Sequence, residues 1–144
     1  MKSTTRCSWC EEDPLYIEYH DTEWGVPLRD EQKLFEFLIL ETFQAGLSWI
    51  TILRKRENFR KALDNFDYKT IALYDEEKIT ELLQDAGIIR NKLKVRATIS
   101  NAVAFMKIQK EFGSFSKYMW GFVNDTPIQN NIKSMSEVKA TTVT

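Results

Sequence analysis

The chain has 144 residues, of which 43% are hydrophobic and 12% aromatic, a composition typical of one globular domain rather than a disordered segment. Charged residues interrupt every apolar run before it could cross a bilayer, and the first residues lack the apolar core of an export signal. The two cysteines, Cys7 and Cys10, are too close in sequence to form a stabilising disulfide framework. We therefore expect a single domain over residues 1–144, located in the cytoplasm and without a membrane partner.

The net charge of −1 conceals a strong segregation of charge. Residues 1–41 carry ten acidic and four basic side chains, and residues 64–85 carry seven acidic and two basic ones. By contrast, residues 54–61 carry five basic side chains and one acidic one, and residues 90–110 carry six basic side chains and no acidic one. Such blocks are typical of solvated helix faces, but two basic segments in an acidic chain also fit a surface that contacts phosphate groups.

The spacing of apolar residues is helical almost throughout, and no segment alternates with period two, so the sequence predicts an all-α fold. Helices are expected over residues 31–40, 49–63, 76–85, 91–112 and 117–123, with Asp30, Ser48 and Asp75 as N-caps of the first three. The inward face of the fourth helix is expected to contain Val95, Ile99, Val103, Phe105 and Met106. The tail over residues 126–144 is polar and contains no closing element.

Glu41 stands where a dense apolar helix, residues 34–40, meets a turn and a second apolar run that opens with Trp49. One interpretation is a helix-terminal carboxylate in solvent. The other is a carboxylate in a cleft, with its proton affinity shifted by the apolar surroundings, because a charge there is costly to desolvate unless a ligand uses it.

A second pattern, residues 81–92, is a short helix, a glycine turn at Gly87 and a second helix that begins with basic residues. We expect Gly87 to allow a tight turn and Ile88 and Ile89 to be buried beneath it. Backbone N–H groups at such a turn can cradle a phosphate, supplemented by the basic side chains of Arg90, Lys92 and Lys94. The alternative is an ordinary helix corner. Together the turn and the charge switch favour a helix-hairpin-helix, over about residues 76–112, that binds the DNA backbone.

Two further groups of residues carry chemistry. Five aromatic side chains in the first third of the chain could pack a core, or could stack a nucleobase beside Glu41: Trp9, Tyr16, Tyr19, Trp24 and Trp49. Cys7, Cys10 and the single histidine, His20, form a partial zinc-ligand set, which falls short of the four ligands of a closed structural site.

Four ordered stretches resemble the 3-methyladenine DNA glycosylase I family of the helix-hairpin-helix DNA glycosylase superfamily, and the likeness extends from Cys7 to about Val138. They are Cys7 with Trp9, residues 13–21 continued by 23–27, residues 44–51, and residues 85–90. The resemblance implies a DNA glycosylase that binds alkylated double-stranded DNA, flips out N3-methyladenine and hydrolyses its N-glycosidic bond.

Position by position, the resemblance places Glu41 as the base-reading carboxylate and the five aromatic residues in the base pocket. It places Ala45, Gly46 and Leu47 in the loop that fills the gap in the DNA stack, and Gly87, Ile89, Arg90 and Lys92 at the phosphate-binding hairpin. No acidic residue lies between residues 90 and 110 to act as the superfamily's catalytic aspartate, and no lysine occupies the lyase position. We therefore expect a monofunctional enzyme.

The chain departs from the family pattern in three respects. Cys7 and His20 match two zinc ligands, but the other two, a His and a Cys near the family's C-terminus, are absent from this sequence, so zinc would need another ligand such as Cys10. Thr42 replaces the usual glycine after the carboxylate. The absent C-terminal segment would also leave apolar surface through which a dimer could form. Two rival interpretations are an inactive DNA-binding helix-hairpin-helix module and a small zinc-structured interaction domain.

Overall fold

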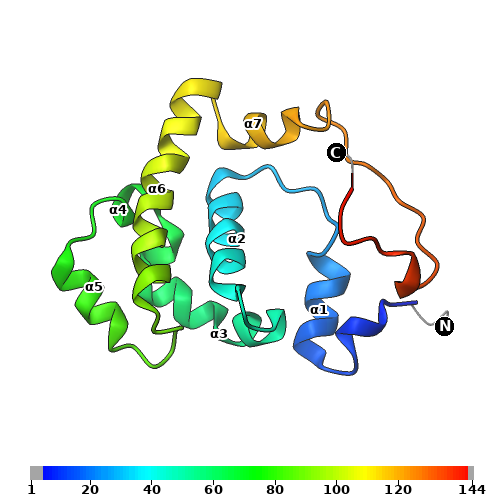
Figure 1. Ribbon diagram of the computed structural model, residues 1–144, viewed down its shortest axis with the longest axis horizontal. Coiled ribbons are helices and arrows are strands. Elements are labelled where there is room, and N and C mark those ends of the chain that lie inside the picture. Colours follow the sequence, from blue (N-terminus) through cyan, green and yellow to red (C-terminus); the bar gives the residue numbers. More distant parts are fainter. Residues whose placement is uncertain (1–4, 143–144) are drawn as a thin grey trace. The chain divides into compact units, whose positions relative to one another are not determined.

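The structure is a computed structural model that describes residues 5–142, and every regular element in that range is a helix (Figure 1). The predicted all-α fold is therefore confirmed. None of the helices found among these residues has both the length and the apolar character that crossing a membrane requires. In chain order the elements are η1 (Ser8–Cys10), α1 (Pro14–Thr22), α2 (Glu31–Gln44), α3 (Trp49–Ala62), η2 (Asp64–Phe66), α4 (Tyr68–Ile71), α5 (Glu76–Leu83), α6 (Lys92–Phe112), α7 (Phe115–Gly121) and η3 (Met135–Glu137).

The chain divides into two compact units. The larger unit is Leu28–Met119, and the smaller unit combines the chain up to Pro27 with the chain from Trp120 onward. The predicted Glu41, loop and hairpin therefore belong to the larger unit, whereas Cys7, His20 and most of the predicted pocket aromatics belong to the smaller one.

The core of the larger unit surrounds the long helix α6, which has α2 on one side and α4 and α5 on the other (Figure 1). Five phenylalanine side chains are at most 1% exposed within it: Phe35, Phe43, Phe59, Phe66 and Phe105. Burying an aromatic side chain of this size contributes about 1.5–3 kcal/mol relative to exposure, so these rings stabilise the packing of α2, α3, η2 and α6.

The predicted N-caps mark the true starts of α2, α3 and α5. The carboxylate of Asp30 accepts a hydrogen bond from the N–H of Lys33 (2.9 Å), and Asp75 accepts one from Lys78 (2.9 Å). Ser48 occupies the N-cap position of α3, but its side chain accepts no hydrogen bond from a backbone N–H of that helix. Its Oγ instead lies 2.6 Å from Oγ1 of Thr51. Helix α2 runs four residues beyond the predicted end, which places Glu41 in its last turn.

The inward face of α6 differs from the prediction at Val103. Val95 and Phe105 are buried as expected, but Val103 is 37% exposed, and Thr98 and Ala102 are buried instead. These residues follow the 3.6-residue helical period, whereas the prediction gave weight to hydrophobicity and so included a valine on the outer side of the stripe.

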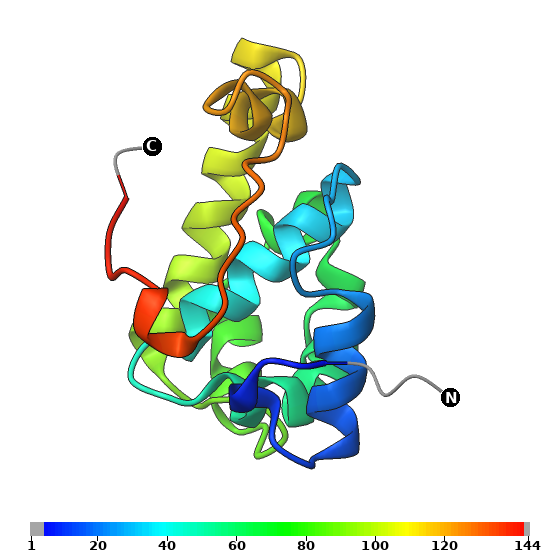
Figure 2. The same cartoon turned by 90° about the vertical axis from the view of Figure 1, so that its right-hand side faces the viewer.

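The chain reverses at Gly113 after α6, so that α7 lies beside the C-terminal end of that helix in both views (Figure 2). Glu31, the first residue of α2, holds this corner. Its carboxylate accepts hydrogen bonds from the N–H groups of Phe115 (2.7 Å) and Ser116 (2.8 Å), and from Nε2 of Gln109 (2.9 Å). A carboxylate at the start of α7 suits the positive end of that helix.

Candidate functional site

Glu41 lies in the last turn of α2, one helical turn after Phe37, so the two side chains share a face of the helix. The ring of Phe37 stacks on that of Trp49, the first residue of α3, with centroids 6.4 Å apart and planes at 27°. Glu41 is exposed, yet partial burial raises its pKa above the ordinary value. The cause is desolvation, which disfavours the charged form. The exposure of Glu41 agrees with the first interpretation of this residue and the raised pKa with the second.

Phe37, which stacks on Trp49, was not among the candidate site residues predicted from the sequence. It was counted as one apolar position in a buried helix, although its four-residue spacing from Glu41 was a signal for a shared face. Thr42, the residue that departs from the family pattern, directs its hydroxyl back to the carbonyl oxygen of Leu38 at 2.7 Å. The Thr42 side chain is therefore accommodated by a local hydrogen bond within the helix.

The loop between α2 and α3, residues 45–48, is exposed and tightly turned. Gly46 has a φ of +80°, in the left-handed region that favours glycine. The N–H of Leu47 donates to the carbonyl oxygen of Gln44 at 2.7 Å, and the Gln44 side chain donates to the carbonyl oxygen of Leu47 at 3.1 Å. These bonds order the loop while Leu47 remains 37% exposed at its tip.

The half-buried side chain of Lys94 binds the end of α2 and this loop through its ammonium group. Its Nζ donates to the carbonyl oxygens of Phe43 (2.9 Å) and Ala45 (2.7 Å), at the C-terminal end of α2. The sequence grouped Lys94 with Arg90 and Lys92 as a phosphate-binding base, because all three follow the glycine turn. The structure instead commits its ammonium to two backbone acceptors that lie about fifty residues earlier in the chain.

The turn between α5 and α6 needs a glycine for a different reason from the one expected. Gly87 does not have a left-handed φ, but a Cβ at this position would lie 3.1 Å from Cβ of Asn58 and 3.0 Å from Oδ1 of Asp85. Its N–H donates to Oδ1 of Asp85 at 2.8 Å and so already has a partner. Gly87 thus permits close packing of the turn on α3, and its amide serves the turn itself. Of the two isoleucines beside it, Ile88 is buried and Ile89 is half-buried.

Backbone groups on the α6 side of the turn are better placed to bind an anion. Among residues 5–142, no acceptor is found for the N–H groups of Ile89 and Arg90. Asn91 caps α6 by accepting from the N–H of Lys94 at 3.0 Å. The side chains of Arg90 and Lys92 are exposed, and neither pairs with an acidic group in the described part of the chain. A helix N-terminus with such bases beside it can bind phosphate oxygens.

Four of the predicted aromatic residues form one cluster in the smaller unit. The ring of Trp9 lies 5.0 Å from that of Tyr16, 6.3 Å from Tyr19 and 5.3 Å from Trp24, measured between centroids. His20 stacks on Trp24 at 5.4 Å with planes at 19°. Burial raises the pKa of the Tyr16 hydroxyl above its ordinary value of 10.0. The fifth predicted ring, Trp49, belongs to the larger unit with Glu41.

The candidate zinc ligands are only partly assembled. Nδ1 of His20 lies 2.9 Å from Oδ1 of Asp21, and Nε2 accepts from the backbone N–H of Cys7 at 3.3 Å. A metal-binding histidine is commonly oriented by a carboxylate in this way. However, Cys10 is buried with its thiol donating to the carbonyl oxygen of Cys7. No group of three or more metal-ligating side chains occurs in the described range, so these residues fit a zinc ion only as part of a larger ligand set.

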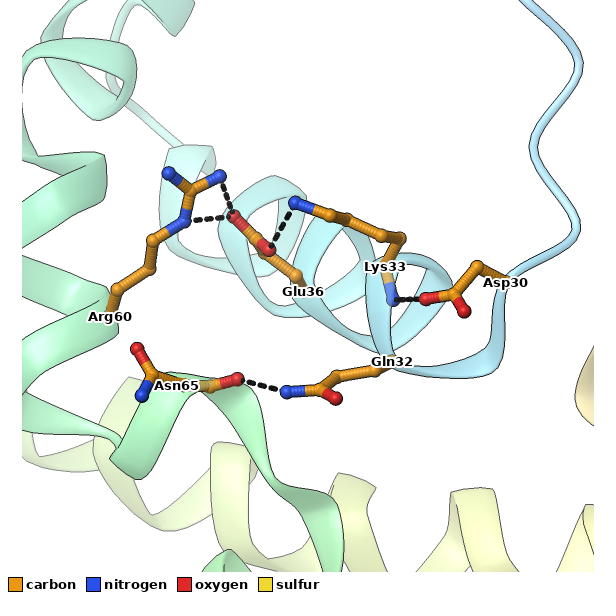
Figure 3. Close-up of a pocket in the computed structure, with 6 residues that line it drawn as sticks. All are labelled: Asp30, Gln32, Lys33, Glu36, Arg60 and Asn65. Carbon is orange, nitrogen blue, oxygen red and sulfur yellow. Dashed lines mark hydrogen bonds and ion pairs between the residues drawn. The ribbon is translucent and has the colours of Figure 1, made fainter.

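A polar pocket of about 240 Å³ lies between α2, α3 and η2. Its lining residues are drawn in Figure 3: Asp30, Gln32, Lys33, Glu36, Arg60 and Asn65. Glu36 is 5% exposed and accepts from both Nε (2.8 Å) and Nη2 (2.7 Å) of Arg60. In this ion pair Arg60 supplies donors to the buried Glu36 carboxylate, and the pair connects α2 to α3. It therefore stabilises the packing of the two helices that carry Glu41 and Trp49.

Comparisons with known proteins match nearly all of the chain. DNA-3-methyladenine glycosylase 1 of Escherichia coli is 47% identical over 95% of this chain and 73% of that protein. DNA-3-methyladenine glycosylase of Haemophilus influenzae is 46% identical over 96% of this chain and 75% of that protein. A crystal structure of 3-methyladenine DNA glycosylase I has a TM-score of 0.92 at 47% identity, covering 96% of this chain and 76% of that one. A variant of such an enzyme, in complex with 3-methyladenine, has a TM-score of 0.91 at 34% identity, covering 94% and 73% of the two chains.

These likenesses cover enough of the chain to extend over both units. The family model for methyladenine glycosylases matches residues 9–144. It thus contains the aromatic cluster from Trp9 onward, the last turn of α2 and the α5–α6 turn. By this match over most of its length, the chain belongs to the methyladenine glycosylase family.

Proposed function

We propose that this protein is a DNA-3-methyladenine glycosylase of base-excision repair, which hydrolyses the N-glycosidic bond of N3-methyladenine in alkylated double-stranded DNA. The observation that carries the proposal is the 46–47% identity with enzymes of that name over almost the whole chain, together with a solved relative that holds 3-methyladenine. The geometry of the larger unit supports it, because Glu41, a carboxylate with a raised pKa, shares a helix face with Phe37, whose ring stacks on that of Trp49.

The chemistry requires little machinery from the protein. Methylation at N3 gives the adenine a positive charge, so the base leaves as a neutral molecule when the bond between N9 and C1′ breaks and its electron pair passes to the base. Water then supplies the oxygen at C1′ and releases a proton, which leaves an abasic site. We assign Glu41 to accept hydrogen bonds from the flipped base and to stabilise the positive charge that develops on the sugar.

Aromatic rings hold the cationic base by stacking and by attraction of its charge to their faces. We assign this role to the cluster of the smaller unit, Trp9, Tyr16, Tyr19 and Trp24, and to Trp49. Their ring geometry supports the assignment, because the centroid of the Trp9 ring lies 5.0–6.3 Å from those of the other three rings, which gathers the aromatic side chains in one place.

The DNA backbone is assigned to the hairpin between α5 and α6. The N–H groups of Ile89 and Arg90, with the side chains of Arg90 and Lys92, would bind phosphate oxygens without reading sequence. Gly87 supports this surface by packing against Asn58. The loop Ala45–Leu47 would enter the DNA stack, and its exposed tip residue Leu47 suits that task. The proposed enzyme is monofunctional, and its reaction ends at the abasic site.

Zinc, compartment and oligomeric state are further parts of the proposal. We propose that Cys7 and His20 contribute to a structural zinc site, since Asp21 orients His20 as a metal ligand is oriented. Metal analysis of the purified protein, with and without a chelator, tests this assignment: less than stoichiometric zinc would contradict it.

Both cysteines are free thiols, which suits the cytoplasm. Sedimentation velocity tests the predicted dimer.

The experiment that tests the function is the release of free 3-methyladenine from methylated duplex DNA. The chain is compared with Glu41→Gln and with Glu111→Gln, a control at an exposed position near the end of α6. We expect release by the chain and by the control, and a loss of roughly 10²-fold or more in Glu41→Gln, by analogy with removing one transition-state partner. Absence of release by the folded chain, with binding to DNA retained, would favour the inactive DNA-binding module.

A further inference from the structure

The ammonium group of Lys94 connects two segments that the proposed function uses separately. Lys94 is the third residue of α6 and follows directly on the hairpin assigned to the DNA backbone. Its Nζ reaches the carbonyl oxygens of Phe43 and Ala45, on the two sides of the junction between α2 and the loop over residues 45–48. Both distances, 2.9 and 2.7 Å, are those of charge-assisted hydrogen bonds.

The end of α2 needs such a partner. The last four carbonyl groups of an α-helix have no N–H donor within the helix. In addition, α2 has no basic residue in its last turn. The carbonyl oxygen of Thr42 accepts a hydrogen bond from the N–H of Ala45, and that of Gln44 accepts one from the N–H of Leu47. The carbonyl of Phe43 is left for Lys94, which also places a positive charge at the negative end of the helix dipole.

Lys94 is itself held at both of its backbone groups. Its N–H donates to Oδ1 of Asn91 at 3.0 Å, and its carbonyl oxygen accepts from the hydroxyl of Thr98, a buried residue, at 2.9 Å. The side chain is half-buried, whereas Lys92, two residues earlier, is exposed. The backbone at the start of α6 is therefore held in place, so that the hydrogen bonds of the Lys94 side chain can fix the position of the loop.

We propose that Lys94 is a positioning residue that locks the loop over residues 45–48, and with it the last turn of α2 bearing Glu41, to the DNA-binding hairpin. The inference rests on the proposed function for its catalytic consequence. Two of the three donors of its ammonium are bound to backbone carbonyl oxygens, so we infer that its main role is to position the loop and not to bind a phosphate. DNA seated on the hairpin is thereby held in register with the loop that enters its stack and with the carboxylate that reads the base.

The test uses the whole chain and three substitutions on α6. Lys94→Met keeps the alkyl stem and removes the donors, and Lys94→Arg retains charge and donors. Lys107→Met is the matched control, since Lys107 is exposed on the same helix and lies outside the site. Three quantities are measured: hydrogen exchange of the Leu47 amide, the single-turnover rate of 3-methyladenine release, and the salt dependence of binding to undamaged duplex.

For Lys94→Met we expect faster exchange of the Leu47 amide, by about tenfold or more, and a single-turnover rate lower by roughly 10- to 100-fold, as a small misplacement of a reacting group costs. The slope of log affinity against log salt should match that of the unsubstituted chain. Lys94→Arg should recover part of the rate, and Lys107→Met should change neither exchange nor rate. As a comparator, Lys92→Met should lower the slope by about 0.9, the value for one lost phosphate contact.

Unchanged exchange at Leu47 in Lys94→Met would overturn the proposal, as would a fall in the salt slope equal to that of Lys92→Met. If the unsubstituted chain releases no base, the proposed function fails for this chain. The exchange measurement still decides whether Lys94 holds the loop, because it does not require activity.

Discussion

Replacing Gly87 by alanine should destabilise the protein by a purely steric route. The new Cβ would lie 3.1 Å from both Cβ and Cγ of Asn58 and 3.0 Å from Oδ1 of Asp85, all closer than ordinary van der Waals contact. The φ of Gly87 lies outside the left-handed region, so the alanine backbone itself is unstrained. The α5–α6 turn must therefore move away from α3 by a few tenths of an ångström, or Asn58 must give way.

The magnitude follows from two opposing terms. Overpacking a close contact costs about 1–3 kcal/mol, whereas replacing glycine by alanine reduces the entropy of the unfolded chain and contributes about 0.4–1 kcal/mol of stability. The net loss in the free energy of unfolding should be about 1–2 kcal/mol. Urea titration measures it, with an unchanged m-value showing that the compactness of the two states is preserved.

A double-mutant cycle with Asn58→Gly isolates the cause, because that change removes both clashing carbon atoms of residue 58. On its own it should cost about 0.3 kcal/mol, the difference in helix propensity between asparagine and glycine in α3. In its background, Gly87→Ala should cost roughly 1 kcal/mol less than in the unsubstituted chain, a coupling typical of residues in contact. Equal costs of Gly87→Ala in both backgrounds, or a stabilising effect in the unsubstituted chain, would refute the steric explanation.

Three further predictions concern α2 and its two ends. Gly46→Ala meets no atom within 4 Å but must adopt a φ near +80°, so it should lower the free energy of unfolding by about 1 kcal/mol in the same urea titration, and no second-site change should relieve the loss. Glu31→Ala removes the acceptor of the Phe115 and Ser116 N–H groups and should cost about 1–3 kcal/mol, with a lower thermal midpoint and faster hydrogen exchange at those two amides than at others in the corner. Burial raises the pKa of Glu41 above its ordinary 4.5, so the native state holds this proton more tightly than the unfolded state, and stability declines as pH rises through the native pKa. Glu41→Gln should therefore be more stable than the unsubstituted chain at neutral pH, and the difference in thermal midpoint should vanish below the ordinary pKa; a difference independent of pH would contradict this.

Local features of this protein could be predicted from the sequence because their causes lie within a few residues. The N-caps Asp30 and Asp75 each bond an N–H three residues later, so the helix starts were readable from residue type and spacing. The all-α class followed from the period of the apolar residues in the same way. The turn at Gly46 also follows from a local requirement, a left-handed backbone between two helices.

The role of Lys94 could not be predicted, because its acceptors are backbone carbonyls about fifty residues away, and any residue type can supply a carbonyl. From charge alone it was indistinguishable from Lys92. Gly87 was correctly singled out, but the reason for it, the nearness of Asn58 on α3, depends on how the turn packs. The exposure of Val103 was likewise decided by the neighbours of α6.

For the candidate site, sequence likeness picked out Glu41, the aromatic residues and the hairpin as members of one family pattern. Tertiary structure decided what each residue contacts. Trp49 stacks on Phe37, and the ring of Trp9 lies next to that of Tyr16 in the smaller unit. The thiol of Cys10 donates to the carbonyl oxygen of Cys7. Residue identity limits the chemistry available to a side chain. Its partners are set by which distant segments the packed helices bring within hydrogen-bonding distance, and that depends on the whole core at once.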